Sequence, residues 1–102
     1  MDPECRSISK LILPAIRASI AEIMSREYRY KQKEIADKLG VVQVAISKYL
    51  NGRYSSEIER LKVEILKKGL SKDIASNIAE GKPSSEIGRE IDSLCGALAG
   101  EK

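Results

Sequence analysis

The sequence contains no histidine, no tryptophan and no phenylalanine, so its four tyrosines are its only aromatic residues. Without histidine, the chain lacks the side chain that most often acts as an acid or base near neutral pH. It also lacks a P-loop, a dinucleotide-binding glycine pattern and a nucleophile elbow. We therefore predict that the protein is not an enzyme and uses no cofactor.

Cysteine is also scarce, and Cys5 and Cys95 lie near opposite ends of the chain. Two cysteines without histidine do not make a metal site within one chain. A site shared between two subunits is the weaker alternative to two reduced thiols in or near the core. No apolar run is long enough to cross a membrane, and Asp2 and Glu4 make the start acidic, unlike a signal peptide. We expect a soluble, cytoplasmic protein.

The abundant residues favour helices. Hydrophobic residues make up 42% of the 102 residues and aromatic residues 4%, so the chain can build a core and that core must be aliphatic. A sheet would contain more aromatic and β-branched clusters than this sequence has. We therefore predict an all-α protein, a bundle of five to six helices.

The net charge of +3 is unevenly distributed along the chain. Residues 26–53 carry seven basic and three acidic side chains, whereas residues 54–102 carry eight basic and nine acidic ones. A local positive excess is typical of a surface that binds phosphates. A solvated basic face is the weaker alternative explanation of this excess.

Residues 32–53 contain the most specific pattern in the chain. Two short apolar repeats at helical spacing are separated by Gly40, which can end a helix in the left-handed conformation at little cost, and the second repeat ends at another glycine. Ala36 is small enough for two helices to cross closely, and Val41 and Ile46 are placed to fill the angle between them. These are the steric requirements of a helix-turn-helix.

The ordered residues of this segment form the pattern Gln32-x-x-Ile35-Ala36-x-x-Leu39-Gly40-Val41-x-x-x-x-Ile46-Ser47-x-Tyr49-Leu50-Asn51-Gly52-Arg53. The pattern resembles the helix-turn-helix of lambdoid phage repressors and Cro proteins, the XRE-type transcription regulators. A weaker resemblance, over Leu13–Arg17, is to short prokaryotic and especially archaeal regulators. The resemblance implies a repressor-like helix-turn-helix within the bundle, with a recognition helix at about Val42–Leu50 that enters the major groove of double-stranded DNA.

The resemblance also implies roles for single residues. Gln43 would bond an adenine bidentately, Lys48 would reach O6 and N7 of a guanine, and Val44 would offer apolar contact, for example with a thymine methyl group. Ser47 would lie near the DNA backbone or a base edge. The residues assigned to phosphates are Gln32, Asn51 and Arg53, together with Arg29 and Lys31 in the connector before the motif.

The patterns divide the chain into three segments. Residues 1–30 form a long helix that kinks at Pro14, divides there into two abutting helices, or begins there. Residues 31–53 form the helix-turn-helix, and residues 54–102 form the C-terminal helices, with Ser71 expected to cap one of them. Because one recognition helix contacts few base pairs, we expect a homodimer. Its candidate interfaces are the surplus length of the first helix and the apolar stripe from Ile87 to Leu98.

Three alternatives fit parts of the pattern. Residues 72–79 resemble residues 33–40, but a second helix-turn-helix is disfavoured because the helix after them carries an acidic face. A DNA-binding antitoxin would need a tail that wraps a partner, whereas the C-terminal helices carry capping signals. A protein-interaction adaptor that no longer binds DNA is the strongest alternative, although it has no reason to retain together Gln32, Gln43, Lys48, Asn51 and Arg53.

Overall fold

The computed structural model describes residues 3–100, with side chains from Lys10 onward, and all regular structure in this range is helical. Within it no helix is both long and apolar enough to cross a membrane. The prediction of an all-α fold is confirmed for these residues. The six helices are α1 (Pro3–Arg26), α2 (Gln32–Leu39), α3 (Gln43–Leu50), α4 (Ser56–Lys68), α5 (Lys72–Ala79) and α6 (Ser84–Gly100).

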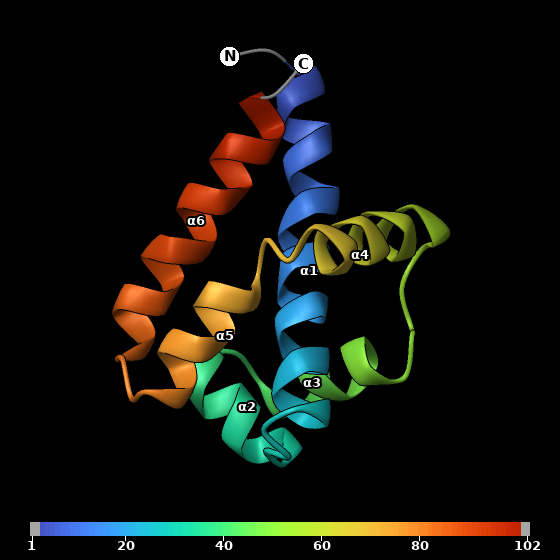
Figure 1. The fold of residues 1–102 in the computed structure, drawn as a ribbon. Helices are drawn as coiled ribbons and strands as arrows, with labels where there is room; N and C mark the ends of the chain where they lie inside the picture. The colour runs from blue at the N-terminus through green and yellow to red at the C-terminus, as the bar shows by residue number, and fades with distance from the viewer. Residues whose placement is uncertain (1–2, 101–102) are drawn as a thin grey trace.

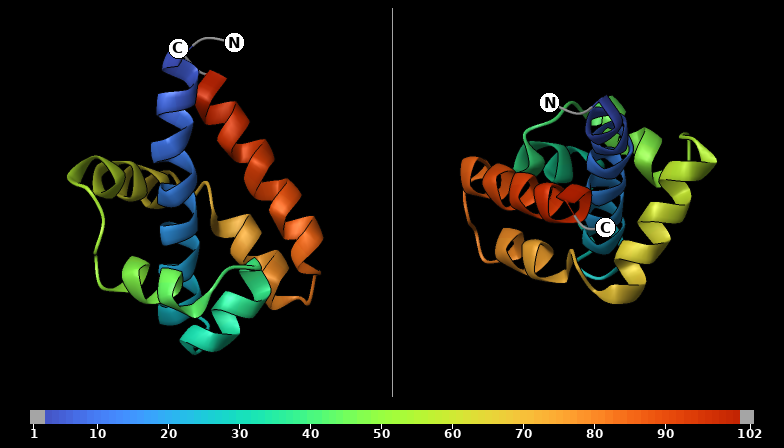
Figure 2. Two further views of the ribbon diagram at one scale, coloured as in Figure 1. Left: turned by 180° about the vertical axis from the view of Figure 1, so that it is seen from behind. Right: turned by 90° about the horizontal axis from the view of Figure 1, so that it is seen from above.

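The central element is α1, which contacts each of the other five helices. Figure 1 shows α4 crossing beside its middle, α6 running alongside it from the end where the termini lie, and α2 and α3 gathered at its opposite end. Seen from behind, α3 lies across the last turns of α1 (Figure 2). The helix α1 is therefore the common packing partner of all the others.

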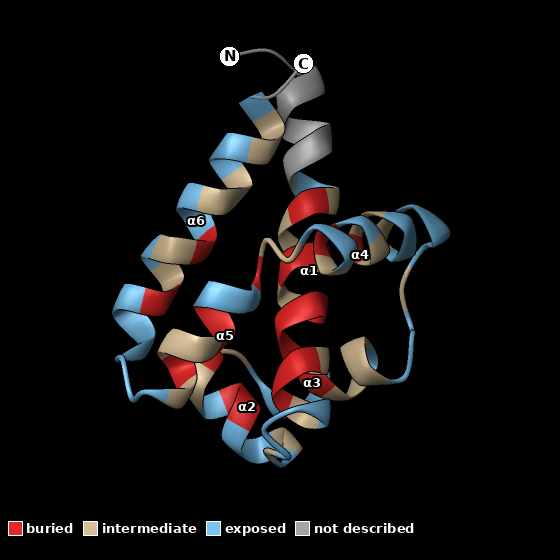
Figure 3. Ribbon diagram, viewed as in Figure 1, coloured by how far each residue is buried: buried red, intermediate tan, exposed pale blue. Residues whose placement is uncertain are grey.

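The second half of α1 is buried on almost all sides (Figure 3). Its large buried residues include Ile16, Ile20 and Met24, and its small residues are buried as well. Small side chains let neighbouring helices approach α1 closely from several directions. This half of α1 is therefore covered by helices of its own chain, and the expected dimer arm stays a prediction. The small residues are Ala15, Ala18, Ser19 and Ala21.

Pro14 lies inside α1, and the helix continues through it. The ring removes one backbone donor, which would otherwise reach the carbonyl of Lys10 one turn earlier. The packing of the following turns maintains the helix despite this loss. Two of the sequence-based alternatives, a pair of abutting helices and a helix that begins at Pro14, are therefore wrong.

The core is aliphatic, as predicted, and Tyr30 and Tyr49 are half-buried at its edge. On α6, Ile87 and Ile91 are buried against the core of their own chain. Most of the apolar stripe from Ile87 to Leu98, which was expected at a dimer interface, thus packs against the core of its own chain. Cys95 is half-buried against the same core, whereas Cys5 falls among the residues whose side chains are not described.

The start of α5 differs from the prediction. Ser71 precedes the helix but makes no side-chain cap. Its hydroxyl oxygen instead lies 3.0 Å from that of Ser19, which donates to the carbonyl of Ile16 at 2.7 Å. Both serines are fully buried, so this hydrogen bond satisfies two polar groups where α5 meets α1.

Candidate nucleic-acid interface

Three residues, 40–42, connect α2 to α3. Gly40 has φ 71°, its amide donates to the carbonyl of Asp37 at 3.3 Å, and the amide of Val41 donates to the carbonyl of Ala36 at 3.0 Å. These two bonds close α2, and the positive φ makes glycine the residue of lowest strain at this corner. Val41 then packs half-buried against the core, which fixes the direction in which the chain enters α3.

One face of α3 anchors it to the molecule. Ile46 is fully buried, and Tyr49 and Leu50 are half-buried against the core. Because residues three and four apart share a helix face, the outer face carries the four predicted base-reading residues. Ser47 is half-buried and the other three are exposed. The structure therefore brings together on one surface Gln43, Val44, Ser47 and Lys48.

Sequence reasoning missed one residue of this surface. Val42, immediately before α3, is 71% exposed, and Val44 is 64% exposed. Val42 makes no side-chain cap, although its carbonyl accepts a hydrogen bond from the amide of Ala45 at 3.0 Å. The available signal was the turn itself, because Val41 is the residue that packs against the core and leaves its neighbour on the outside. Two exposed valines therefore flank Gln43.

The connector before α2 contains three of the predicted phosphate-binding residues. Gln32 is the first residue of α2 and is half-buried, while Arg29 and Lys31 are exposed. The amide of Lys31 donates to the carboxylate of Glu34 at 3.0 Å, which satisfies one backbone group at the helix start. Arg29 has φ 57°, a strained value for this residue type, and it turns the chain from α1 toward α2.

The other two predicted phosphate-binding residues follow α3, and both are exposed. The amide of Arg53 donates to the carbonyl of Lys48 at 2.9 Å, which holds the chain close to the last turn. The side-chain amide of Asn51 donates to the hydroxyl of Ser47 at 3.2 Å. Ser47 can therefore still donate its own proton, but one of its acceptor positions is occupied.

A polar cluster holds the chain directly after Arg53. The Tyr54 hydroxyl donates to Glu59 at 2.8 Å, and Lys62 Nζ lies 5.6 Å from the centre of the Tyr54 ring. Lys62, which is 8% exposed, pairs with Glu22 on α1 at 3.0 Å and with Glu59 at 3.3 Å. The cluster ties α1, α4 and the exit from α3 together, so it positions the end of the predicted recognition surface.

The charges of this cluster reinforce one another. Burial by itself lowers the pKa of Lys62, but hydrogen bonds with Tyr54 and Glu22 and the charge of Glu22 outweigh it, so the pKa lies above its ordinary value. The hydrogen bond from Tyr54, together with Lys62, lowers the pKa of Glu59. Burial raises the pKa of Tyr54. At neutral pH the cluster thus holds an ammonium group, a carboxylate at Glu59 and a neutral phenol.

The chemistry offered by this surface is hydrogen bonding, apolar contact and positive charge. Among the side chains that the structure describes, no group of three or more cysteine, aspartate or glutamate residues could hold a metal ion. No family model, curated protein or solved structure matches the chain.

Proposed function

We propose that this protein is a transcription regulator that binds specific double-stranded DNA sequences through α3. In this proposal α2 and α3 form a repressor-like helix-turn-helix of the XRE type, and α3 is the recognition helix. The observation that carries the proposal is the outer face of α3. There Gln43, Val44 and Lys48 are exposed on a helix whose opposite side is fixed in the core.

The size and side chains of α3 suit a major groove. An α-helix with its side chains is about 10–12 Å across, and the major groove is about 12 Å wide and admits one helix. Gln43 on the first turn would pair with N6 and N7 of an adenine, and Lys48 one turn later with a guanine. Val44 would contact a thymine methyl group. Ser47 would donate to a base edge or a phosphate.

Positive charge near α3 supports binding to the DNA backbone. Residues 26–53 contain seven of the 18 basic residues of the chain. Gln32 and Lys31 lie at the start of α2, where the helix dipole favours an anion such as a phosphate. Asn51 and Arg53 would contact phosphates beyond the other end of α3, and Arg29 would contribute from the connector.

A single helix of this length reads few base pairs, so useful specificity requires two copies on one operator. We therefore include a homodimer in the proposal, with half-sites about one helical turn of DNA apart. An inverted repeat in the operator is the expected consequence, since it mirrors the two-fold symmetry of a dimer.

One observation favours a second function. The exposed valines at positions 42 and 44 are the kind of apolar surface that a protein partner would cover. An adaptor that uses this scaffold without binding DNA is therefore the alternative. It does not account for the polar and basic residues that surround the valines, notably Gln43, Lys48 and Arg53.

Selection from a randomised duplex library distinguishes sequence-specific DNA binding from the adaptor function. The wild type, a Gln43→Ala/Lys48→Ala variant and a Ser84→Ala/Arg89→Ala control would be compared at one salt concentration. The control removes a similar pair of exposed side chains from α6. We expect the wild type and the control to enrich the same inverted repeat, and the α3 variant to lose that enrichment.

Two other outcomes contradict the proposal. Equal, salt-sensitive retention of every duplex would indicate binding through phosphates without base reading. No retention at low salt would remove DNA binding altogether and would leave the adaptor function.

A further inference from the structure

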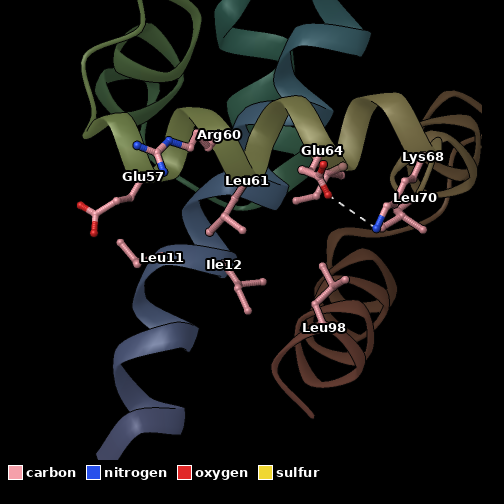
Figure 4. A pocket seen from close by; sticks show the side chains of 10 residues that line it. Leu11, Ile12, Glu57, Arg60, Leu61, Glu64, Lys68, Leu70 and Leu98 are labelled. Carbon is pink, nitrogen blue, oxygen red and sulfur yellow. Dashed lines mark ion pairs between the residues drawn. The ribbon is translucent and has the colours of Figure 1, made fainter. Parts of the chain in front are cut away.

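A groove of about 410 Å³ lies between the first half of α1, α4 and the end of α6 (Figure 4). Leu11, Leu61 and Leu98, which line it, are half-buried and leave apolar surface open to solvent. Figure 1 shows that this region of α1 is far from the end where α2 and α3 pack. The groove is therefore separate from the candidate nucleic-acid interface.

The α4 wall of the groove carries charges of alternating sign. Acidic and basic residues three or four positions apart share one helix face, and all of them are exposed. The Nζ of Lys68 lies 3.5 Å from a carboxylate oxygen of Glu64, but both side chains are more than half exposed, so this ion pair contributes little to stability. In chain order the face reads Glu57, Arg60, Glu64 and Lys68.

We infer that this groove binds a second copy of the same chain, with the two α4 helices antiparallel about a two-fold axis. A two-fold contact places a surface against its own reversed copy. Reversing the order acid, base, acid, base gives base, acid, base, acid. Glu57 therefore faces Lys68 of the partner subunit, and Arg60 faces Glu64 of the partner subunit, and symmetry makes each pair occur twice.

The other features of the groove agree with this occupant. The half-buried leucines supply apolar area that a second copy would remove from water. Two acidic and two basic residues on the wall balance each other, whereas a nucleic acid or an acidic peptide would meet the carboxylates of Glu57 and Glu64. The inference rests on α4 and the groove, and it holds whether or not α3 binds DNA.

Sedimentation velocity over a broad range of protein concentration tests the contact. R60E places two carboxylates opposite each other on both sides of the axis, and E64R does the same with two cations. We expect each variant to weaken dimerisation by about tenfold or more, because like charges at a contact are strongly unfavourable. R89E, which makes the same charge change on α6, is the matched control and leaves the dimer unchanged.

Mixing the two variants gives the sharpest test. In an equimolar mixture of R60E and E64R, each acidic position of one chain faces a basic position of the other, so mixed dimers form at the wild-type strength. A general folding defect would not produce this rescue, and circular dichroism of each variant checks its helix content. The expected readout is a dimer in the mixture and monomers in each variant alone.

Three results overturn the inference. The first is a wild-type chain that stays monomeric at every concentration. The second is R60E and E64R variants that dimerise as strongly as the wild type, and the third is a mixture that does not recover the dimer. The assay contains no DNA, so it leaves base reading by α3 to its own experiment. A monomeric wild type would also contradict the homodimer of the proposed function, whereas the other two results would remove only this α4 contact.

Discussion

Two helix pairs in this molecule share a plan. In α2–α3 and in α5–α6, an eight-residue helix is followed by a glycine with positive φ, which is 71° at Gly40 and 98° at Gly81. In both pairs the second helix begins three residues after that glycine. In each pair a fully buried isoleucine, Ile46 or Ile87, lies six residues after the glycine. The same corner between two helices, with a glycine at the turn and a buried isoleucine after it, thus occurs twice.

The two pairs differ in what their second helix presents to solvent. The eight residues of α3 expose a polar and basic face, whereas α6 has 17 residues and carries acidic side chains. One of these, Glu90, accepts a hydrogen bond from Asn77 on α5 at 2.7 Å and lies 3.5 Å from Lys82 in the turn. A shared corner therefore does not assign a function, and the outward side chains do.

We expect the largest losses of stability when either of the two buried isoleucines is truncated, and comparing the losses tests whether the two corners are packed alike. Ile46→Ala and Ile87→Ala would each leave a cavity in the core. We expect each to lower the free energy of unfolding by about 3 kcal/mol, measured by urea denaturation followed by circular dichroism. If one of them cost less than about 1 kcal/mol, the two corners would not be packed alike.

The polar contacts beside the two pairs should differ in strength. Lys62→Met leaves Glu22 and Glu59 without their buried cation, so we expect the free energy of unfolding to fall by about 2 kcal/mol at neutral pH. Lys82→Met is the matched change at α5–α6, where the lysine is more exposed, and should cost less than about 1 kcal/mol. Equal losses of unfolding free energy in the two variants would contradict the expectation that the Lys62 contacts are stronger than those of Lys82.

The pH dependence of these variants follows from Glu59. Its pKa in the folded protein lies below the ordinary value of 4.5, so its stabilising contribution is complete above that pH and is lost as the pH falls through the folded pKa. The wild type should therefore lose stability in this acidic window. Lys62→Met should lose less there, as measured by urea denaturation at a series of pH values, because the contribution of Lys62 to the lowered pKa of Glu59 is absent while the hydrogen bond from Tyr54 remains.

The two corner glycines should respond alike to alanine. A Cβ at Gly40 would lie 3.8 Å from the Cβ of Ser84, an ordinary contact, and one at Gly81 would meet nothing within 4 Å. Both substitutions therefore cost mainly the left-handed backbone, about 1 kcal/mol each in thermal or urea unfolding. Gly88→Ala, inside α6 with open space around it, is the control and should stabilise the protein instead.

The smallest effect concerns the strained connector before α2. Three residues before α5 the backbone also has a positive φ, 68°, but there it falls on Gly69, which adopts it at little cost. Arg29→Gly relieves a positive φ and should raise the free energy of unfolding by about 0.5 kcal/mol. If Arg29 contacts a phosphate, the same change should reduce the slope of DNA affinity against salt concentration by about one. Arg29→Ala should show the change in slope without the gain in stability.

The local features of the fold could be predicted from the sequence. Apolar spacing and terminating glycines indicated the helices, and the spacing around Ile46 correctly placed Gln43, Val44 and Lys48 on an exposed face. Both signals act within one or two helical turns. Val42 was assigned no contact because the resembled pattern gives that position no role, although the place of Val41 in the turn indicated that its neighbour lies outside. Binding of DNA by this face stays a prediction.

Features that depend on distant residues could not be predicted. The hydroxyl of Ser71 bonds Ser19, 52 positions away, and Lys62 pairs with Glu22, 40 positions away. Periodicity carries no information about such partners. The central position of α1 depends on small residues such as Ala18, which indicate a helix in the sequence but do not reveal how many neighbours will pack against it.

The packing of every other helix on α1 has a consequence for how the molecule opens. Every other helix loses packed surface when α1 leaves, so we expect local fluctuations not to expose the amides of its buried half. These amides should exchange with deuterium at one slow rate, set by unfolding of the whole molecule. During synthesis α1 precedes its five partners, and its apolar surface is therefore not fully covered until α6 has emerged from the ribosome.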